Sequence, residues 1–262
     1  MGESSSICPR GGSAAPTEAP PPRRREAATR VSLLESLQSV IERTYDLDTG
    51  VRDIGRFVIG DQGYRELYGP FEEREPEPVR TLSADPEAAG ARTLLRQAEH
   101  GLAVCIYYPD SLVSCLERHD PCRSLDHRNV DAFAVLVEEL DHFLMIAERY
   151  RSRGEMSLLE LELHANVTKH LVMELFVARL RGTARLMEAD RAWIRFHLFD
   201  KAEYADPDPD VRARYREASR LAARYLRAIE KMEPAGRVTE LRRFHRMAPQ
   251  AKRAHISRLA AA

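Results

Sequence analysis

The segment 129–181 constrains the fold of this chain most strongly, because it predicts two consecutive long helices. Apolar residues recur at helical spacing over 130–150 and again over 158–181. The second helix is apolar around most of its circumference, which indicates that other elements surround it. Ser157, followed three residues later by Glu160, forms a capping-box pattern at its start. We therefore expect a mainly α protein whose helices pack around a central buried helix.

A short β element precedes these two helices. The runs 92–97 and 102–108 flank a turn that contains Gly101, and the second run is rich in β-favouring residues. Pro109 ends this run, because proline cannot donate a hydrogen bond to a neighbouring strand. These features predict a β-hairpin near 91–108. The expected class is thus α+β, with a small N-terminal β element.

The composition along the chain predicts one folded unit preceded by a tail. Residues 1–29 are poor in apolar side chains and contain five prolines and an arginine run, which is typical of a disordered tail. Residues 30–262 are expected to form a single helical domain. Its further helices are predicted at 31–44, 110–118, 186–204, a stretch ending near 232, 238–247 and 249–259.

The sequence also bounds the compartment. It contains no run of about 18 apolar residues, so we expect no membrane span. The first residues have no apolar core of a secretory signal, which leaves the cytoplasm as the default localisation. None of the four cysteines forms a Cys-x-x-Cys pair, so we expect free thiols and no disulfide framework.

Each of the two long helices carries an acid and a histidine one turn apart. Glu139 and His142 are three residues apart, and Glu160 and His164 are four residues apart, so each pair shares one helical face. Apolar residues lie above and below the first pair, and the second pair continues into an apolar strip, whereas a solvent-facing pair usually has polar neighbours. We therefore expect these four side chains to meet at one buried polar site.

Other polar residues of the second helix lie on a different side. Glu162, Asn166 and Lys169 follow one another at helical spacing, away from the stripe that carries Glu160 and His164. We expect them to meet solvent near the start of that helix.

Two carboxylates and two imidazoles that converge between helices are a ligand set for a divalent metal such as Zn, Fe or Mn. The segment Glu139-Leu-Asp-His142 resembles the Glu-x-x-His motif of the ferritin-like di-iron proteins, in which helical bundles hold metal ions. That resemblance implies Glu139 and His142 as metal ligands. The second helix departs from the motif, because Glu160 and His164 are four residues apart.

The segment Glu138-Glu139-Leu-Asp-His142 also resembles the His-Glu-x-x-His motif of zincin peptidases, with Glu138 in place of the first histidine. The resemblance implies that His142 is a ligand and Glu139 the general base. Glu138 is an alternate ligand, or an alternate acid or base. Glu160 or His164 would supply a further ligand. The function hypothesis is thus a metal-binding helical protein, with a degenerate zincin-like hydrolase as its catalytic form.

Two alternatives stand beside this hypothesis. The acid–histidine pairs can satisfy each other as buried hydrogen-bonded pairs without any metal. Residues 211–262 contain 14 Lys and Arg residues against 4 Asp and Glu residues, a net charge of +10. Since basic faces neutralise phosphates, this segment can bind an acidic partner or nucleic acid, or its arginines can pair with the acidic remainder of the chain.

Overall fold

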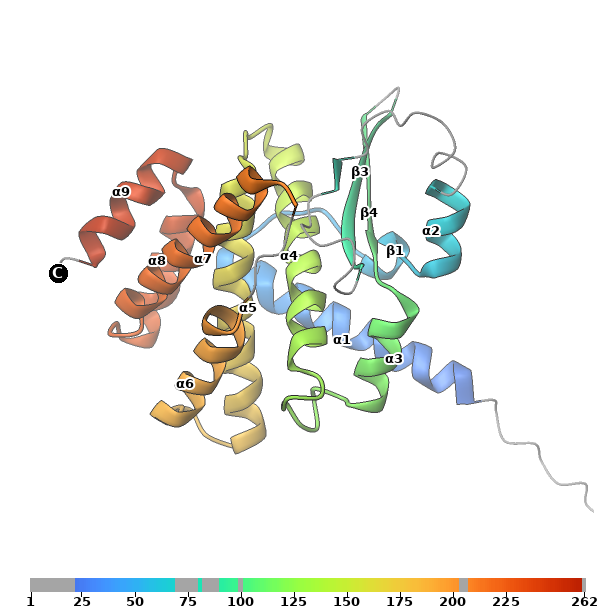
Figure 1. Cartoon of the computed structure of the whole chain (residues 1–262), viewed down its shortest axis with the longest axis horizontal. Helices are drawn as coiled ribbons and strands as arrows, with labels where there is room; N and C mark the ends of the chain where they lie inside the picture. The colour runs from blue at the N-terminus through green and yellow to red at the C-terminus, as the bar shows by residue number, and fades with distance from the viewer. Residues whose placement is uncertain (1–21, 69–79, 82–89, 99–100, 203–206, 261–262) are drawn as a thin grey trace, which may run out of the picture.

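The fold is mainly helical with a small sheet on one side, as expected from the sequence (Figure 1). The computed structural model describes residues 22–68, 80–81, 90–98, 101–202 and 207–260. Within these residues there are nine α-helices: α1 (Pro22–Tyr45), α2 (Asp61–Tyr68), α3 (Asp110–Arg118), α4 (Val130–Ser152), α5 (Leu158–Arg181), α6 (Glu188–Arg195), α7 (Pro209–Ile229), α8 (Pro234–Arg246) and α9 (Pro249–Leu259).

The sheet is built around a hairpin in the region where the sequence predicts one. Strands β3 (Arg92–Ala98) and β4 (Gly101–Tyr107) pair antiparallel, with Arg92 opposite Tyr107. Strand β1 (Val58–Ile59) adds to β4 in parallel, and β2 (Arg80–Thr81) adds to β3 antiparallel. Among the described residues the strand order is therefore β1-β4-β3-β2. Both β3 and β4 contact α4, so the hairpin covers one side of that helix.

Helices α4 and α5 form the pair on which the site is built. A connection of only five residues, 153–157, joins them, so they run side by side in opposite directions. The Ser157 hydroxyl accepts a 3.2 Å hydrogen bond from the backbone N–H of Glu160, which caps α5 as its sequence predicts. Gly182, with φ at 63°, ends α5 in the left-handed conformation that favours glycine.

The core lies between the sheet, α4 and the C-terminal helices. In Figure 1 the sheet lies on one side of α4, and α7 and α8 lie beyond α5. Fully buried apolar side chains from α4 and α7 join those of α1 and the sheet in one cluster, which includes Ile41, Ile106, Phe133, Val137, Leu140, Leu144, Ala222 and Tyr225. Burial of this apolar surface is the main favourable term that holds the helices together.

Helix α5 is buried over a long stretch. Every residue from Glu160 to His170 is buried, including the polar ones. The expectation that Glu162, Asn166 and Lys169 meet solvent is therefore wrong, because their exposed fractions are only 0%, 4% and 8%. Other helices pack against this side of α5, with α7 its main neighbour.

Several element boundaries differ from the predicted ones. Helix α1 begins at Pro22, ahead of the predicted start at 31; residues 1–21 of the predicted tail lie outside the described residues. Helix α6 passes into a π-helical turn, Phe196–Asp200, and does not continue to 204 as one α-helix. No helix among the described residues is long and apolar enough to cross a membrane.

Candidate metal centre

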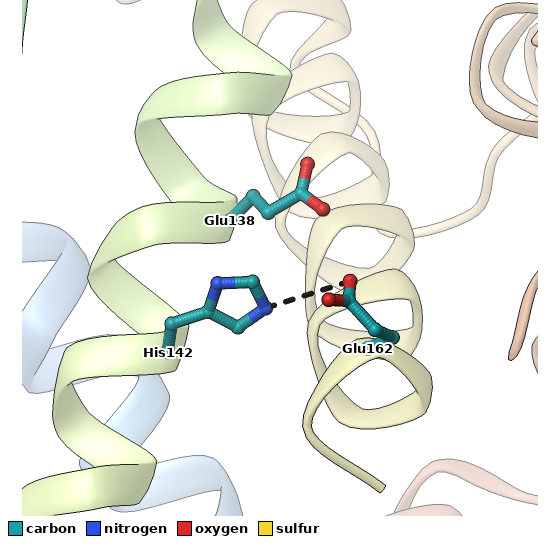
Figure 2. A group of neighbouring side chains, drawn as sticks. All are labelled: Glu138, His142 and Glu162. Carbon is teal, nitrogen blue, oxygen red and sulfur yellow. Dashed lines mark ion pairs between the residues drawn. The ribbon is translucent and has the colours of Figure 1, made fainter. Parts of the chain in front are cut away.

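Three side chains from α4 and α5 converge in the space between the two helices (Figure 2). Glu138 and His142 are one turn apart on α4, and Glu162 comes from the first turns of α5. A carboxylate or imidazole ligand atom from each of the three lies within 4.8 Å of one from each of the others. The group offers one nitrogen and two oxygen ligands, a mixed set that suits Zn, Fe or Mn.

His142 lies at the centre of this group. Its Nε2 atom is 3.8 Å from Glu162 Oε2, and its Nδ1 atom is 3.6 Å from Glu139 Oε2. Both distances exceed a normal hydrogen bond, and within the described part of the chain neither ring nitrogen has a hydrogen-bond partner. The His142 side chain is fully buried. Each ring nitrogen of this buried imidazole therefore faces a carboxylate at a distance longer than a hydrogen bond.

Glu139 is hydrogen-bonded to a residue of the sheet. The hydroxyl of Thr93 on β3 donates to Glu139 Oε2 at 2.9 Å, and it also lies 3.0 Å from the Glu139 carbonyl oxygen. Both residues are buried. Glu139 therefore faces Nδ1 of His142, whereas Glu162 faces Nε2. The negative charge of a carboxylate on this side of the ring favours a proton on Nδ1 and leaves Nε2 to face Glu162.

The charges in this space shift the pKa values of its residues. Burial alone would lower the pKa of His142, but the three carboxylates around it raise that pKa to about 9. Burial raises the pKa of Glu162 to about 7, against the opposing charge of His142. Burial would also raise the pKa of Glu138, but Lys169 and then His142 bring it below its usual value. At neutral pH His142 is therefore protonated in the metal-free protein.

Two further residues border the group. Lys169 Nζ lies 2.9 Å from Glu138 Oε2, so the ammonium of α5 pairs with the carboxylate of α4. Tyr215 on α7 lies beside Glu162, and burial together with the charge of Glu162 raises the pKa of its hydroxyl well above the ordinary value. The Tyr215 hydroxyl thus stays protonated and is able to donate to that carboxylate.

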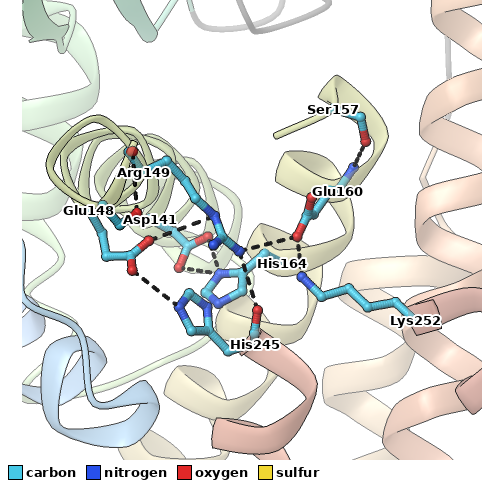
Figure 3. A network of polar contacts seen from close by, with 9 residues as sticks. Asp141, Glu148, Arg149, Ser157, Glu160, His164, His245 and Lys252 are labelled. Atoms are coloured by element: carbon cyan, nitrogen blue, oxygen red, sulfur yellow. Dashed lines mark hydrogen bonds and ion pairs between the residues drawn. The ribbon is translucent and has the colours of Figure 1, made fainter. Parts of the chain in front are cut away.

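Glu160 and His164, the two predicted ligands from α5, belong to a different network (Figure 3). His164 Nδ1 is hydrogen-bonded to Asp141 at 2.9 Å, and Glu160 pairs with the buried Lys252 of α9. Arg149 also reaches Glu160, at 3.4 Å. The structure therefore does not bring the four predicted side chains to one point, and it joins His142 with Glu162 instead.

The reason is the rotation between neighbouring positions on a helix. Successive residues of an α-helix are about 100° apart, so Asp141 and His142 face different sides of α4. For the same reason Glu160 and Glu162, about 200° apart, face nearly opposite sides of α5. On α4 the predicted acid and histidine, Glu139 and His142, do lie 3.6 Å apart, whereas on α5 Glu160 and His164 bind different partners. The predicted pairing did not determine which face of α5 meets which face of α4.

His245 of α8 completes the second network. Its ring lies 5.4 Å from that of His164, centroid to centroid, and its Nε2 atom is 3.9 Å from Glu148. Burial and the neighbouring positive charges lower the pKa of His245 to about 2, so it stays neutral. The network also contains two cations, Arg149 and Lys252. Both pair with the carboxylate of Glu160 and neutralise its charge.

Sequence reasoning missed Thr93, Glu162 and Lys169. Glu162 stands between two leucines in a helix that is apolar almost all round, and that flanking was the available signal of its burial. The contact of Thr93 with Glu139 joins residues 46 positions apart and has no signature in the sequence.

The basic segment 211–262 carries both paired and unpaired arginines. Several pair with carboxylates of the chain: Arg220 with Glu217, Arg237 with Glu174, Arg243 with Glu240 and Arg246 with Asp46. Arg216, Arg253 and Arg258 are exposed, and none of them forms an ion pair with another described residue.

Comparison of the chain with protein families, with curated proteins and with solved structures gave no match.

Proposed function

We propose that this protein binds a divalent metal ion between α4 and α5, with His142, Glu138 and Glu162 as its ligands. The observation that carries the proposal is the separation of 3.8 Å between His142 Nε2 and Glu162 Oε2. Two ligand atoms bound to one ion at about 2.1 Å lie about 3.4 Å apart in tetrahedral geometry and about 4.2 Å apart when opposite. A spacing too long for a hydrogen bond is thus suited to a shared ion.

The charge balance supports the same proposal. Three carboxylates, those of the buried Glu139 and Glu162 and the partly buried Glu138, surround His142, and Lys169 is the neighbouring ammonium. With every group ionised and His142 protonated, this cluster carries one excess negative charge. With a divalent ion in place and His142 neutral, the charges cancel. Burial makes an uncompensated charge costly, which favours the occupied state.

The proposal assigns different roles to the residues predicted as catalytic. Glu139 faces Nδ1 of His142 and accepts a hydrogen bond from Thr93. We therefore propose that Glu139 orients His142 and does not abstract a proton. Glu138 is assigned as a ligand. A bound divalent ion supplies Lewis-acid activation of a water or carbonyl group, the chemistry of the hydrolase predicted from the zincin-like motif.

The contacts of α4, α6 and α7 with α5 support the interpretation of α5 as the central helix.

The experiment is elemental analysis of the purified full-length protein after expression with added Zn, Fe and Mn. Wild type is expected to carry close to one equivalent of one of these metals. His142→Ala and Glu162→Gln are expected to lose it, because each removes a ligand. His164→Ala and Glu160→Gln are the matched controls, since they remove the same residue types from the neighbouring network. A wild-type protein without metal, or retention of metal by His142→Ala, contradicts the proposal.

A second candidate function is the binding of an acidic partner by α7 and α9. It is favoured by the exposed arginines Arg216, Arg253 and Arg258, which have no ion-pair partner among the described residues. Binding through phosphate contacts weakens steeply with salt. Titration of a labelled nucleic acid at about 50 mM and about 200 mM salt tests it, with a triple Arg→Gln variant as control. Absence of binding at the lower salt concentration removes this candidate.

A further inference from the structure

Lys169 lies at the most accessible edge of the proposed metal site. Its Nζ atom is 2.9 Å from Glu138 Oε2, and the side chains of Lys169 and Glu138 are 10% and 19% exposed. The His142 and Glu162 side chains, by contrast, have no exposed surface. An ion that enters from solvent therefore meets the Lys169–Glu138 pair before it reaches the histidine.

Helical geometry explains how Lys169 reaches this edge. It follows Glu162 by seven residues, two turns along the same face of α5, with Asn166 between them. Side chains on a helix tilt toward its N-terminus, so the long stem of Lys169 extends back over that face toward the ligands. Its charge lies close enough to influence both Glu138 and Glu162.

The ammonium and a divalent ion compete for the same carboxylate. While Glu138 is paired with Lys169, its carboxylate is partly neutralised and attracts an ion less strongly. In addition, two cations a few ångströms apart in a poorly solvated site repel each other strongly. Without the ammonium, however, the carboxylates of the metal-free site would have only the imidazolium of His142 as a cationic partner. One lysine therefore stabilises the empty site and opposes its occupation.

We propose that Lys169 is a built-in competitor of the metal ion: it neutralises Glu138 in the metal-free protein and leaves that carboxylate when the ion binds. This inference rests on the metal site proposed above. Lys169 thereby determines the affinity of the site, because each ion must displace the ammonium. An ion of higher charge displaces it more readily, so the site discriminates divalent from monovalent cations.

The test is calorimetric titration of full-length, chelator-stripped protein with ZnCl2 and with MnCl2, comparing wild type with three variants. Lys169→Met keeps the length of the side chain and removes its charge, and we expect it to bind about tenfold more tightly or better. Lys169→Arg keeps the charge and is expected to remain close to wild type or weaker. Lys252→Met is the matched control, because Lys252 is also a buried lysine paired with a glutamate, Glu160, but in the other network. Its affinity is expected to stay unchanged.

The outcomes separate this inference from the proposed site. If wild type binds metal and Lys169→Met binds it equally well or more weakly, the competition is refuted. The proposed metal site is not affected by that result. Binding by Lys169→Met alone supports the competition. Absence of binding in wild type and in a folded Lys169→Met refutes the site itself, and the inference with it.

A second measurement needs no variant. Acetic anhydride labelling of wild type, read out at Lys169 by mass spectrometry, is expected to increase on zinc addition, with Lys252 as internal reference. Zinc that binds in the titration but leaves the labelling of Lys169 unchanged overturns the inference.

Discussion

The hydroxyl of Thr93 on β3 lies 2.9 Å from a carboxylate oxygen of Glu139 on α4, and both residues are buried. This contact joins the sheet to the helix that carries His142. Because Glu139 in turn lies 3.6 Å from His142 Nδ1, the sheet orients the imidazole through one intervening carboxylate. The small β element thus belongs to the site as well as to the core.

Thr93→Val is therefore expected to weaken zinc binding by about 10- to 100-fold, the usual effect of removing a group that orients a metal ligand. Valine has nearly the same shape but cannot donate to Glu139. The measurement is competition against a chromophoric chelator. Thr168→Val is a matched control, since Thr168 is also a buried threonine but contacts Tyr45. An affinity unchanged in Thr93→Val would show that the ring needs no such support.

The stability of the metal-free protein should fall as pH rises through the range set by His142. The pKa of His142 is about 9 in the folded protein, against an ordinary value of 6.5. Since the folded state holds this proton more tightly, the stabilisation is fully present below 6.5 and is lost as pH rises through 9. Urea unfolding with EDTA at pH 6 and pH 9.5 should differ by about 1–3 kcal/mol in the contribution of His142.

His142→Gln isolates that contribution, because the variant should lack this part of the decline. A difference between wild type and variant that does not change with pH would contradict the raised pKa. Zinc affinity should follow the opposite trend and rise with pH, because zinc must displace the proton of His142 and needs Glu162 ionised.

His245 predicts a loss of stability on the acid side. Its pKa is lowered to about 2 in the folded protein, so the unfolded chain binds a proton that the folded chain does not. The folded state is therefore at full stability above pH 6.5 and loses stability as pH falls below it. His245→Phe is expected to unfold at a lower pH than wild type in an acid titration followed by circular dichroism. An identical acid midpoint would indicate that other groups govern acid unfolding.

The Lys252–Glu160 pair should show strong coupling. Both side chains are 2% exposed, so removal of Glu160 leaves the buried ammonium of Lys252 unpaired, and removal of Lys252 leaves Glu160 with Arg149 alone. Glu160→Leu is expected to lower the free energy of unfolding by about 3–5 kcal/mol, and Lys252→Met by less, because Arg149 remains. The double variant Lys252→Met/Glu160→Leu should recover much of this loss, because it removes both charges. Additive losses in urea unfolding would argue against a direct interaction.

The arrangement of elements was largely predictable, because it depends on local patterns. The helical spacing over 130–150 and 158–181 and the run before Pro109 predict α4, α5 and β4. These signals arise from burial of one helical face and from the geometry of proline, and both are local to the sequence.

The candidate site was predictable only in part. His142 was identified from its spacing to Glu139 on one helix, and Glu138 from the zincin-like motif. Their partner was not, because the rotation of α5 about its own axis follows from the packing of α4 and α7 against it. The choice of Glu162 over Glu160 is a tertiary property, decided by the position of Lys252 as much as by the carboxylates.

The Thr93–Glu139 contact also bears on the order of assembly. It closes a loop across 46 positions of the chain, whereas the turns of α4 and α5 close over only a few residues. Helix formation alone therefore does not bring Glu139, and with it the His142 imidazole, to its final surroundings. During refolding, helicity should recover before zinc affinity does, and the delay between the two signals would measure how long the hairpin takes to dock.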